Sequence, residues 1–468
     1  MALSRIWAAF IIIAILAASL QAVFSPDRKD IFNKMVVGKS GDTSRTLQID
    51  STELSAAAYK KLDSLKEIKS GDKKIIKTAE NKIISYREQN ADGIIATCKT
   101  AVDLSINLIG IMALFMGFMS IAERAGGIRL LSKMIGPFFS KLFPEVPKNH
   151  PAMGHMMMNF SANLLGLDNA ATPFGIKAME SLQEINPKKE TASNAQIMFL
   201  CLHASGLTLI PVSIIAARAA LKSANPTDIF VPCMIATFVA TMAAMLIVSY
   251  KQKINVFQPV ILLWVGGVSA IIALLVIYLT TLSFRGVQTF SGVLSNGLIL
   301  FIFFVIVLGA LYKKINIFDS FVDGAKNGFE TAVRIIPYLV GMLVAISMLR
   351  TSGTFDVIIE GMKNLFASLG ADTRFVDGLP TALIKPLSGS GARGMMIDTM
   401  KTFGPDSFSG RLASVLQGSS DTTFYVIAVY FGAVSIKNTR YAIGSMLLAD
   451  LVGIITSIVL CYMFFGGA

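Results

Sequence analysis

The sequence predicts an all-α polytopic membrane protein with inverted-topology repeats, re-entrant helical hairpins and broken helices. First, 53% of its residues are hydrophobic and only 15% are charged, whereas soluble domains are nearer a quarter charged. Second, it contains uncharged stretches of about 20 residues, the length that crosses a hydrocarbon core roughly 30 Å thick. Third, the second half repeats the layout of the first: Thr100-Ala101-Val102 recurs as Thr331-Ala332-Val333, each followed by a span, an amphipathic stretch and a broken hairpin.

The chain carries a net charge of +12. No basic stretch is interleaved with aromatic residues, so nucleic acid is not an expected partner. Lysine and arginine lie instead in short loops, where they face anionic lipid. Membrane lipid and a small-molecule solute are therefore the expected partners, and a homo-oligomer stays open.

Nothing in the sequence indicates a cofactor or an enzyme. The four cysteines and three histidines have no metal-ligand spacing, so neither a metal nor a cofactor is expected. The G-x-G-x-x-G match at 389–394 follows no strand, which makes it a weak dinucleotide signal. No G-x-x-x-x-G-K-[ST] motif occurs. We expect no enzymatic activity.

The N-terminal part divides into two segments. Residues 1–24, with Arg5 before an apolar run, predict a transmembrane helix or signal anchor, and cleavage after the small residues at 18–22 stays open. Residues 25–99 are polar and predict an extracytoplasmic helical insert. Leu54, Ala58, Leu62 and Leu65, and then Ile76, Ala79 and Ile83, fall at helical spacing, with a turn expected at Gly71-Asp72.

The rest of the chain is organised around the membrane. Full spans are predicted at 101–122, 195–217, 229–249, 258–282, 291–312, 331–349, 412–434 and 441–465. Residues 153–181 and 379–400 mix apolar residues with glycine, proline and charge. Such backbone cannot face lipid, because each unsatisfied group costs several kcal/mol there. These two stretches are predicted to be re-entrant hairpins buried in protein.

The spans group into two repeats, at 100–250 and 331–468. Linker transmembrane helices and an amphipathic connector at 251–330 join them. An odd number of spans separates the two starts, so the repeats are inverted, as in many secondary transporters. Loops on the N-terminal side hold more lysine and arginine than those on the other side, the insert left out. The positive-inside rule then places the protein in the cell inner (plasma) membrane with a cytoplasmic N-terminus and an extracytoplasmic insert.

Polar residues cluster in the two hairpins and in two spans, where glycine and proline unwind helices and free backbone groups for a ligand. The candidate substrate-binding residues are Asn163, Asp168, Asn169, Thr172, Ser205, Thr208, Ser388, Ser390, Arg393, Gln417, Ser419, Asp421 and Thr422. The alternative for each is that it holds helices together. Asp421 is the strongest candidate, because a carboxylate inside a span needs a partner. Lys385 or Arg393 is the expected partner if Asp421 is structural.

Several of these motifs resemble known families. Residues 151–175, 191–194 and 208–211 resemble the spore maturation protein A family. Residues 386–392, 404–407, 410–414, 417–419, 422–425 and 439–441 resemble the spore maturation protein B family. Both belong to the nucleoside recognition or Gate-domain family, which also occurs in concentrative nucleoside transporters and ferrous iron transport proteins. The chain resembles an A-like repeat fused to a B-like repeat.

The resemblance implies a transport core made of hairpins and broken helices, without fixing a substrate. The chain departs from the expected pattern at Asp168, His203 and Asp421, where glycine, asparagine and glutamate are expected. We expect a secondary transporter or permease for a small polar, nucleoside-like solute. The alternative is a non-transporting membrane scaffold in envelope or spore maturation, with the insert as its docking module. If the protein is a transporter, Asn169, Thr208, Ser390, Gln417 and Asp421 should converge near the membrane midplane.

Overall fold

The structure is a computed structural model that describes residues 2–24, 30–49, 62, 67–70, 73–77, 83–147, 149–164, 168–208, 210–282 and 284–466. It divides into two compact units. The first comprises residues 1–5, 101–342 and 359–468, and the second comprises residues 6–100 and 343–358.

Within the described residues, seven helices are long and apolar enough to cross a membrane. Their sequences are predominantly apolar over 18 residues or more, as a transmembrane helix requires. They are α1 (Ala2–Phe24), α4 (Ile94–Arg124), α10 (Phe230–Gln252), α11 (Pro259–Thr280), α12 (Phe284–Tyr312), α13 (Ile317–Thr351) and α19 (Ala442–Phe465). The predicted connector before 331 is continuous with the following span in α13.

The other two predicted spans are interrupted helices. Residues 195–217 form α8 (Asn194–Ala204) and α9 (Val212–Ala220), separated by non-helical chain. Residues 412–434 form α17 (Phe408–Gly418), α18 (Thr423–Val426) and the π-helix η4 (Ile427–Phe431). Both predicted hairpins are present: α6 (Pro151–Leu164) with α7 (Asp168–Glu184), and α15 (Leu379–Ile384) with α16 (Gly389–Phe403). Helices α5 (Gly127–Leu142) and α14 (Thr354–Ser368) precede them, and the 3-10 helix η3 (Arg374–Gly378) leads into α15.

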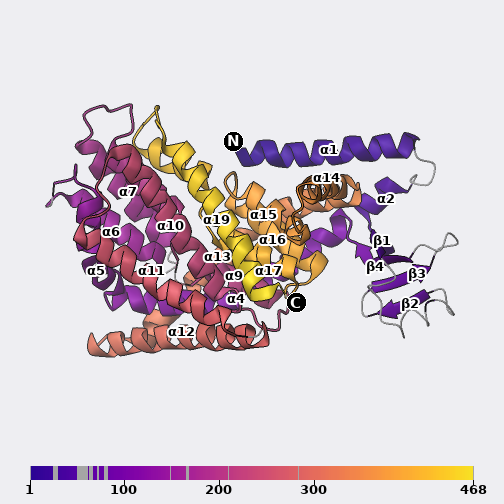
Figure 1. Ribbon diagram of the computed structural model, residues 1–468, viewed down its shortest axis with the longest axis horizontal. Helices are drawn as coiled ribbons and strands as arrows, with labels where there is room; N and C mark the ends of the chain where they lie inside the picture. The colour runs from indigo at the N-terminus through magenta and orange to yellow at the C-terminus, as the bar shows by residue number, and fades with distance from the viewer. Residues whose placement is uncertain are drawn as a thin grey trace. The chain divides into compact units, whose positions relative to one another are not determined.

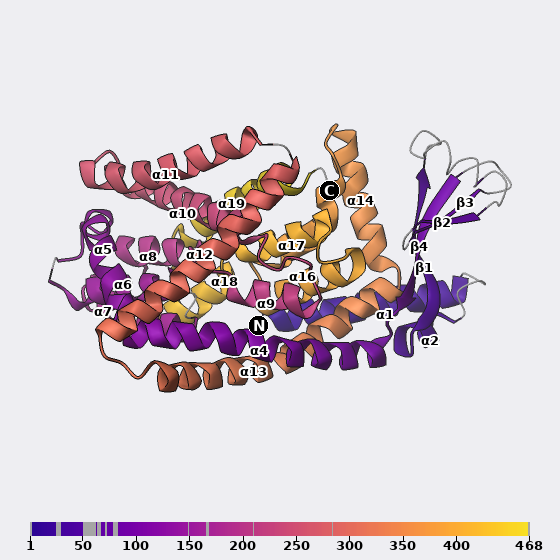
Figure 2. The ribbon, with the colours of Figure 1, turned by 90° about the horizontal axis from the view of Figure 1, so that it is seen from below.

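The two repeats pack against each other through equivalent helices. Helix α10 closes the first repeat and α19 closes the second, and the two lie side by side (Figure 1). Helices α4 and α13, which open the repeats, also run alongside one another (Figure 2). They cross closely because α13 presents glycine there: a Cβ on Gly324 would lie 2.3 Å from the carbonyl oxygen of Met116. Small residues permit such close crossings in membranes.

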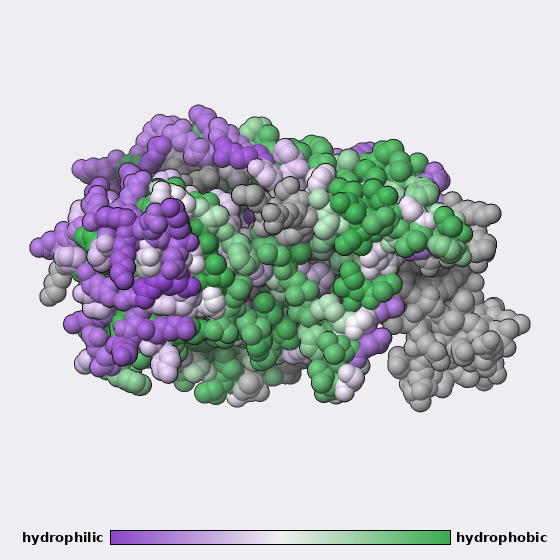
Figure 3. Space-filling model, turned by 90° about the horizontal axis from the view of Figure 1, so that it is seen from above, coloured by the Kyte–Doolittle hydropathy of each residue, from purple (hydrophilic) through white to green (hydrophobic). Residues whose placement is uncertain are grey.

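The surface of the first unit fits a lipid environment. In helix α11, only 6% of the most apolar 18-residue stretch is buried. Helix α12 exposes large side chains that include Leu300, Phe301 and Phe304. Figure 3 shows hydrophilic side chains gathered at one end of a face whose middle is covered by apolar ones. Exposed apolar surface of this extent is stable in hydrocarbon and not in water. The chain is a multi-pass membrane protein.

The insert differs from the prediction. After α2 (Ile31–Val36), its described residues form an antiparallel sheet in the order β1-β4-β3-β2, where β1 is Lys39–Ile49, β2 is Glu67–Ser70, β3 is Lys73–Lys77 and β4 is Ile83–Ala91. The helix predicted from Ile76 and Ile83 is therefore wrong. Ile76 pairs with Ile84 across β3 and β4, and β-branched side chains suit such a surface better than a helix. Residues 50–61, 63–66, 71–72 and 78–82, which hold most of the other predicted helix and the turn, lie outside the described residues.

Candidate functional site

The two broken helices meet at their breaks. In the first, Gly206 has a φ of +67°, a left-handed conformation that favours glycine, and Pro211 begins the next helix without an N–H to donate. In the second, α17 stops at Gly418 and α18 starts at Thr423. The backbone N–H of Asp421 donates to the carbonyl of Ala204 across 2.7 Å. The crossing predicted for the centres of 195–217 and 412–434 is present.

A cavity of about 400 Å³ lies at this crossing. Both repeats and both hairpins contribute to its wall. The candidate residues that line it are Asn163, Thr172, Thr208, Arg393, Gln417, Asp421 and Thr422. Polar or aromatic residues outside the candidate set also line it: His203, Lys385, Ser420, Tyr425 and Tyr430. His203 and Lys385 stand in the polar patches of the sequence. Tyr425 ends one of the motifs that carry the family resemblance, whereas Tyr430 lies in an otherwise apolar stretch that gave no signal.

Four candidates lie off the cavity and make contacts within the protein. The Ser205 hydroxyl donates to Thr241 Oγ1 at 2.8 Å, and the Ser419 hydroxyl donates to the carbonyl of Leu416 at 2.9 Å. Ser388 caps α16 by accepting from the N–H of Gly391 at 3.0 Å, which satisfies one free donor of the helix end.

Ser390 is the fourth, and its hydroxyl lies 3.3 Å from that of Ser388. Ser205 bonds another helix, α10, as in the alternative considered for each, whereas the bonds of the other three are local. The side chains of Asp168 and Asn169 lie outside the described residues. Of the five residues expected to converge, Thr208, Gln417 and Asp421 do so on the cavity wall.

Gln417 lines the cavity and has a buried acceptor that is not used within the described residues. Its side chain is 5% exposed, and within the described part of the chain its Oε1 has no hydrogen-bond partner. Its Nε2 lies 3.5 Å from the carbonyl of Gly389, at the start of α16. A buried polar atom without a partner costs about 1–3 kcal/mol. A donor from a bound solute would remove that cost.

Asp421 faces His203 across the wall of the same cavity. The Asp421 carboxylate is 46% exposed, and its Oδ2 lies 3.9 Å from Nε2 of His203, which is 4% exposed. The His203 ring packs edge-on against Tyr430, with ring centroids 4.8 Å apart. Gly175 leaves the room for this arrangement, because a Cβ there would lie 2.5 Å from the Tyr430 ring.

Lys385 belongs to a second buried group at the crossing. It interacts electrostatically with Asp450, a carboxylate of α19 that is 4% exposed. The Thr423 hydroxyl donates to Asp450 Oδ2 at 2.6 Å. His203 is thus a cation-forming group placed against Asp421, and the expected partners Lys385 and Arg393 line the same cavity.

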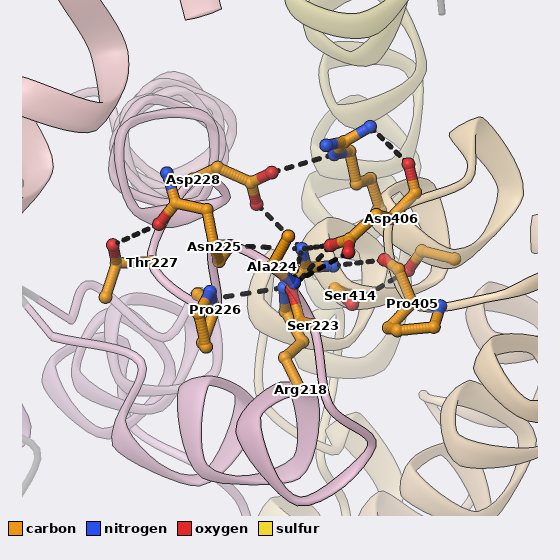
Figure 4. Close-up of polar contacts among 12 residues, drawn as sticks. Arg218, Ser223, Ala224, Asn225, Pro226, Thr227, Asp228, Pro405, Asp406 and Ser414 are labelled. Carbon is orange, nitrogen blue, oxygen red and sulfur yellow. Dashed lines mark hydrogen bonds and ion pairs between the residues drawn. The ribbon is translucent and has the colours of Figure 1, made fainter. Parts of the chain in front are cut away.

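A buried ion cluster joins the repeats on one face of the membrane. Arg218, at the end of α9, is fully buried and lies between Asp228 at 2.9 Å and Asp406 at 3.1 Å (Figure 4). Arg411 bonds the other oxygen of Asp228 at 2.8 Å. Arg218 and Asp228 belong to the first repeat, and Asp406 and Arg411 belong to the second, so the cluster ties the two repeats together.

Asp406 lies in the connection outside the spans. Burial raises the pKa of its carboxyl, but hydrogen bonds from Ser223 and the Ala224 N–H, together with the charge of Arg218, outweigh burial and lower the pKa overall. Asp406 is thus ionised and held by both repeats at neutral pH.

The equivalent connections on the opposite face are joined mainly by backbone hydrogen bonds. The Ala192 N–H, before α8, donates to the carbonyl of Asn438, before α19, at 2.9 Å. Lys437 pairs with Glu190 at 2.7 Å, with both side chains about 70% exposed. Exposed pairs of this kind contribute little to stability. The two faces therefore differ in the kind of contact: one holds a buried ion cluster, and the other holds backbone hydrogen bonds and an exposed ion pair.

Known proteins match both repeats. The family described as nucleoside recognition, Gate, matches residues 105–221 and 332–437. Each stretch starts within a repeat's first span and runs through its hairpin and broken helix. Spore maturation protein B of Bacillus subtilis (strain 168) is 50% identical over 175 residues, which are 37% of this chain and 97% of that protein. Spore maturation protein A of the same organism is 44% identical over 152 residues, 32% of this chain and 78% of that protein.

A solved structure is also similar. It is described as CNTnw in an inward-facing substrate-bound state. The TM-score is 0.34 with 13% sequence identity, and the match covers 78% of this chain and 76% of that one.

Proposed function

The chain belongs to the nucleoside recognition (Gate) family together with spore maturation proteins A and B, and on that basis we propose that it is a secondary transporter for a small, polar, nucleoside-like solute. The solute binds in the cavity at the crossing of the broken helices. Transport requires no chemical change in the solute, so the protein acts as a carrier and not as an enzyme.

The unsatisfied Gln417 Oε1 is the observation that carries this proposal. This atom is buried, and Gln417 lines a cavity of about 400 Å³. That volume is within the range of roughly 300–1,000 Å³ typical of small-molecule sites. Nearby, the Asp421 carboxylate accepts hydrogen bonds, as the hydroxyl groups of a ribose require. The ring of Tyr425, which is 56% exposed, offers apolar surface to a base. The set suits an uncharged solute with several donors and one aromatic face.

We also propose the inner (plasma) membrane as the location, with the N-terminus in the cytoplasm. The excess of lysine and arginine in the loops on the N-terminal side supports this orientation. It would put the Arg218 cluster on the extracytoplasmic face and the Glu190–Lys437 contact on the cytoplasmic face.

Ligand-dependent stabilisation tests the function. Purified protein is heated with uridine, adenosine, free bases or inorganic phosphate. A bound solute at a hundredfold excess over its Kd stabilises the protein by about 2.7 kcal/mol. We expect a rise in Tm with a nucleoside, which Gln417→Leu should abolish. Ser414→Ala is the matched control, because its buried hydroxyl on the same helix bonds the carbonyl of Gly410 and does not line the cavity.

A nucleoside that stabilises the wild type and Gln417→Leu equally would place binding elsewhere. No stabilisation by any member of the panel would contradict the proposal.

The names of the relatives favour a second function, a scaffold in spore or envelope maturation. The insert would then be a docking module, and its described residues form a small sheet in which β1 and β2 each pair with one neighbour. Such edges accept further strands. Deleting residues 25–99 discriminates between the two functions. A scaffold loses its cellular phenotype, whereas a transporter keeps solute uptake in vesicles.

A further inference from the structure

We propose that transport is coupled to protons and that the pair His203–Asp421 is the proton-binding site. The inference rests on the proposed function. It starts from the distance of 3.9 Å between His203 Nε2 and Asp421 Oδ2 on the cavity wall. That gap is too long for a hydrogen bond and short enough for a strong charge interaction once the ring gains a proton.

The neighbours of His203 fix which ring nitrogen changes its protonation. Asn159 is fully buried, and its Nδ2 donates to the carbonyl of Ala171 at 2.6 Å. Its Oδ1 therefore faces His203 Nδ1, at 3.0 Å, as an acceptor. Nδ1 must carry a hydrogen to make this bond. The half-buried amide of Asn163, 2.8 Å from the same nitrogen, fits when its oxygen is turned toward the ring.

Proton exchange is then confined to Nε2. Neutral His203 with its hydrogen on Nδ1 takes up one proton at Nε2 and becomes an imidazolium, and release of the same proton restores the neutral ring. Nε2 is the nitrogen that points toward Asp421. The Asp421 carboxylate is 46% exposed, so it connects the buried ring to water in the cavity. The pair is a buried acceptor of protons with a route to solvent.

The other groups around the pair set its charge balance. Tyr430 of η4 packs on the ring, and Asn159 and Asn163 of α6 are neutral. Lys385 and Arg393, from the second hairpin, line the same cavity. Asp450 of α19 lies near Asp421 and also interacts with Lys385.

Asp421 therefore shares the cavity wall with two basic side chains and lies near a second carboxylate. His203 is the group at the crossing whose ordinary titration range, near neutral pH, suits a reversible charge.

Protonation at this place reaches both repeats. His203 is in the last turn of α8, one residue before Ala204, whose carbonyl accepts the backbone N–H of Asp421. A new attraction between the imidazolium and the carboxylate would draw the two breaks together. It would also hold the carboxylate in place for a solute hydroxyl, so proton binding favours solute binding and the two move together.

Reconstituted full-length protein tests the inference with uridine as the probe. Liposomes hold a pH-sensitive dye, and valinomycin with potassium clamps the membrane voltage. We expect uridine entry to acidify the lumen in the wild type and in His155→Gln, which removes a histidine bonded to Ser181 and absent from the cavity wall. In His203→Gln, any remaining uridine entry should cause no acidification.

Uridine exchange by the wild type without acidification would overturn the coupling and leave the transport function standing. If the wild type exchanges no uridine, both the proton coupling and the proposed transport function are contradicted. Nitrogen-15 spectra of histidine-labelled protein, assigned with His203→Gln, cover the case in which that variant does not transport. We expect Nδ1 of His203 to stay protonated while Nε2 gains a proton as the pH is lowered. A ring whose Nε2 gains no proton while the protein remains folded would also overturn the inference.

Discussion

The backbone N–H of Asp421 donates to the carbonyl oxygen of Ala204 at 2.7 Å, and this bond joins the broken helix of one repeat to that of the other. Because the contact uses the backbone, it persists when the Asp421 side chain is changed. The carboxylate accepts from the Thr422 N–H at Oδ1, at 2.7 Å, and it is 46% exposed on the cavity. The backbone of Asp421 therefore joins the repeats, while Oδ2 of its side chain is left for a ligand.

Asp421→Asn should abolish solute uptake and leave folding close to normal. The substitution keeps the shape of the side chain and the backbone bond but removes the charge. Uptake in vesicles and Tm in detergent are measured side by side. Glu190→Gln, an exposed carboxylate remote from the cavity, should change neither. If the carboxylate serves a structural ion pair instead, Asp421→Asn should destabilise the protein markedly while some uptake survives.

Gly206→Ala should damage both stability and uptake. Gly206 has a left-handed φ of +67°, and a Cβ there would lie 3.0 Å from the Asp421 nitrogen. An L side chain in this conformation costs about 1–2 kcal/mol before any clash. Gly444→Ala is the control, because its Cβ would meet no atom within 4 Å. Equal Tm values for the two variants would show that the break tolerates a side chain.

Arg218→Met should be among the most damaging substitutions in the chain. It leaves the buried Asp228 with fewer partners, and breaking a buried pair on one side typically costs 3–5 kcal/mol. Lys437→Met breaks the exposed contact on the other face and should change stability little. Chemical unfolding of both variants checks the difference. Similar losses in the free energy of unfolding would mean that the exposed ion pair contributes as much to stability as the buried cluster.

Stability should fall at acid pH partly through Asp406. Its pKa is lowered in the folded protein, so its stabilising effect is complete above the ordinary carboxyl value near 4 and is lost as pH falls through the folded value. Burial of Asp228 acts in the opposite sense, because it raises that residue's pKa against the charges of Arg218 and Arg411. The difference between wild type and Asp406→Asn isolates the Asp406 contribution. That difference should shrink on acidification from about pH 6 to pH 3, and a constant difference would contradict the assignment.

Single cysteines test the orientation. Cysteines introduced in the insert and at the C-terminus should react with a membrane-impermeant reagent added to intact cells, and one placed at Lys313 should not. The native cysteines Cys98, Cys201, Cys233 and Cys461 are removed first. Labelling at Lys313 from outside would reverse the proposed topology.

Much of the membrane part follows from the sequence because lipid imposes a strict rule on backbone. The hairpins can be predicted because residues such as Pro173 and Pro386 interrupt apolar stretches, which then cannot cross the membrane as single helices. The helix break at Gly206 can be predicted for the same reason. Water imposes no such rule on the insert. There the helical spacing of Ile76 and Ile83 is accidental, and sheet pairing between residues of different strands decides the structure.

The cavity was only partly predictable. Polar residues in apolar stretches identify Thr208, Gln417 and Asp421, but the same signal includes Ser205 and Ser419, which bond within the protein. Tyr430 could not be found, because an aromatic residue in a span usually faces lipid or core.

The role of Arg218 could not be predicted from the sequence either. Its position after a span indicates a loop charge, and the buried pairing depends on residues of the distant α16–α17 connection.

The cavity wall has a further consequence for stoichiometry. His203 and Thr208 come from one repeat and Gln417 and Asp421 from the other, so neither repeat encloses the site alone. In a single polypeptide the two parts are always present in equal number and at high effective concentration. Assembly of the site is then independent of expression level and of dilution in the membrane. Two separate chains would have to associate in the membrane. Excess copies of either chain would expose the polar residues of the cavity to lipid.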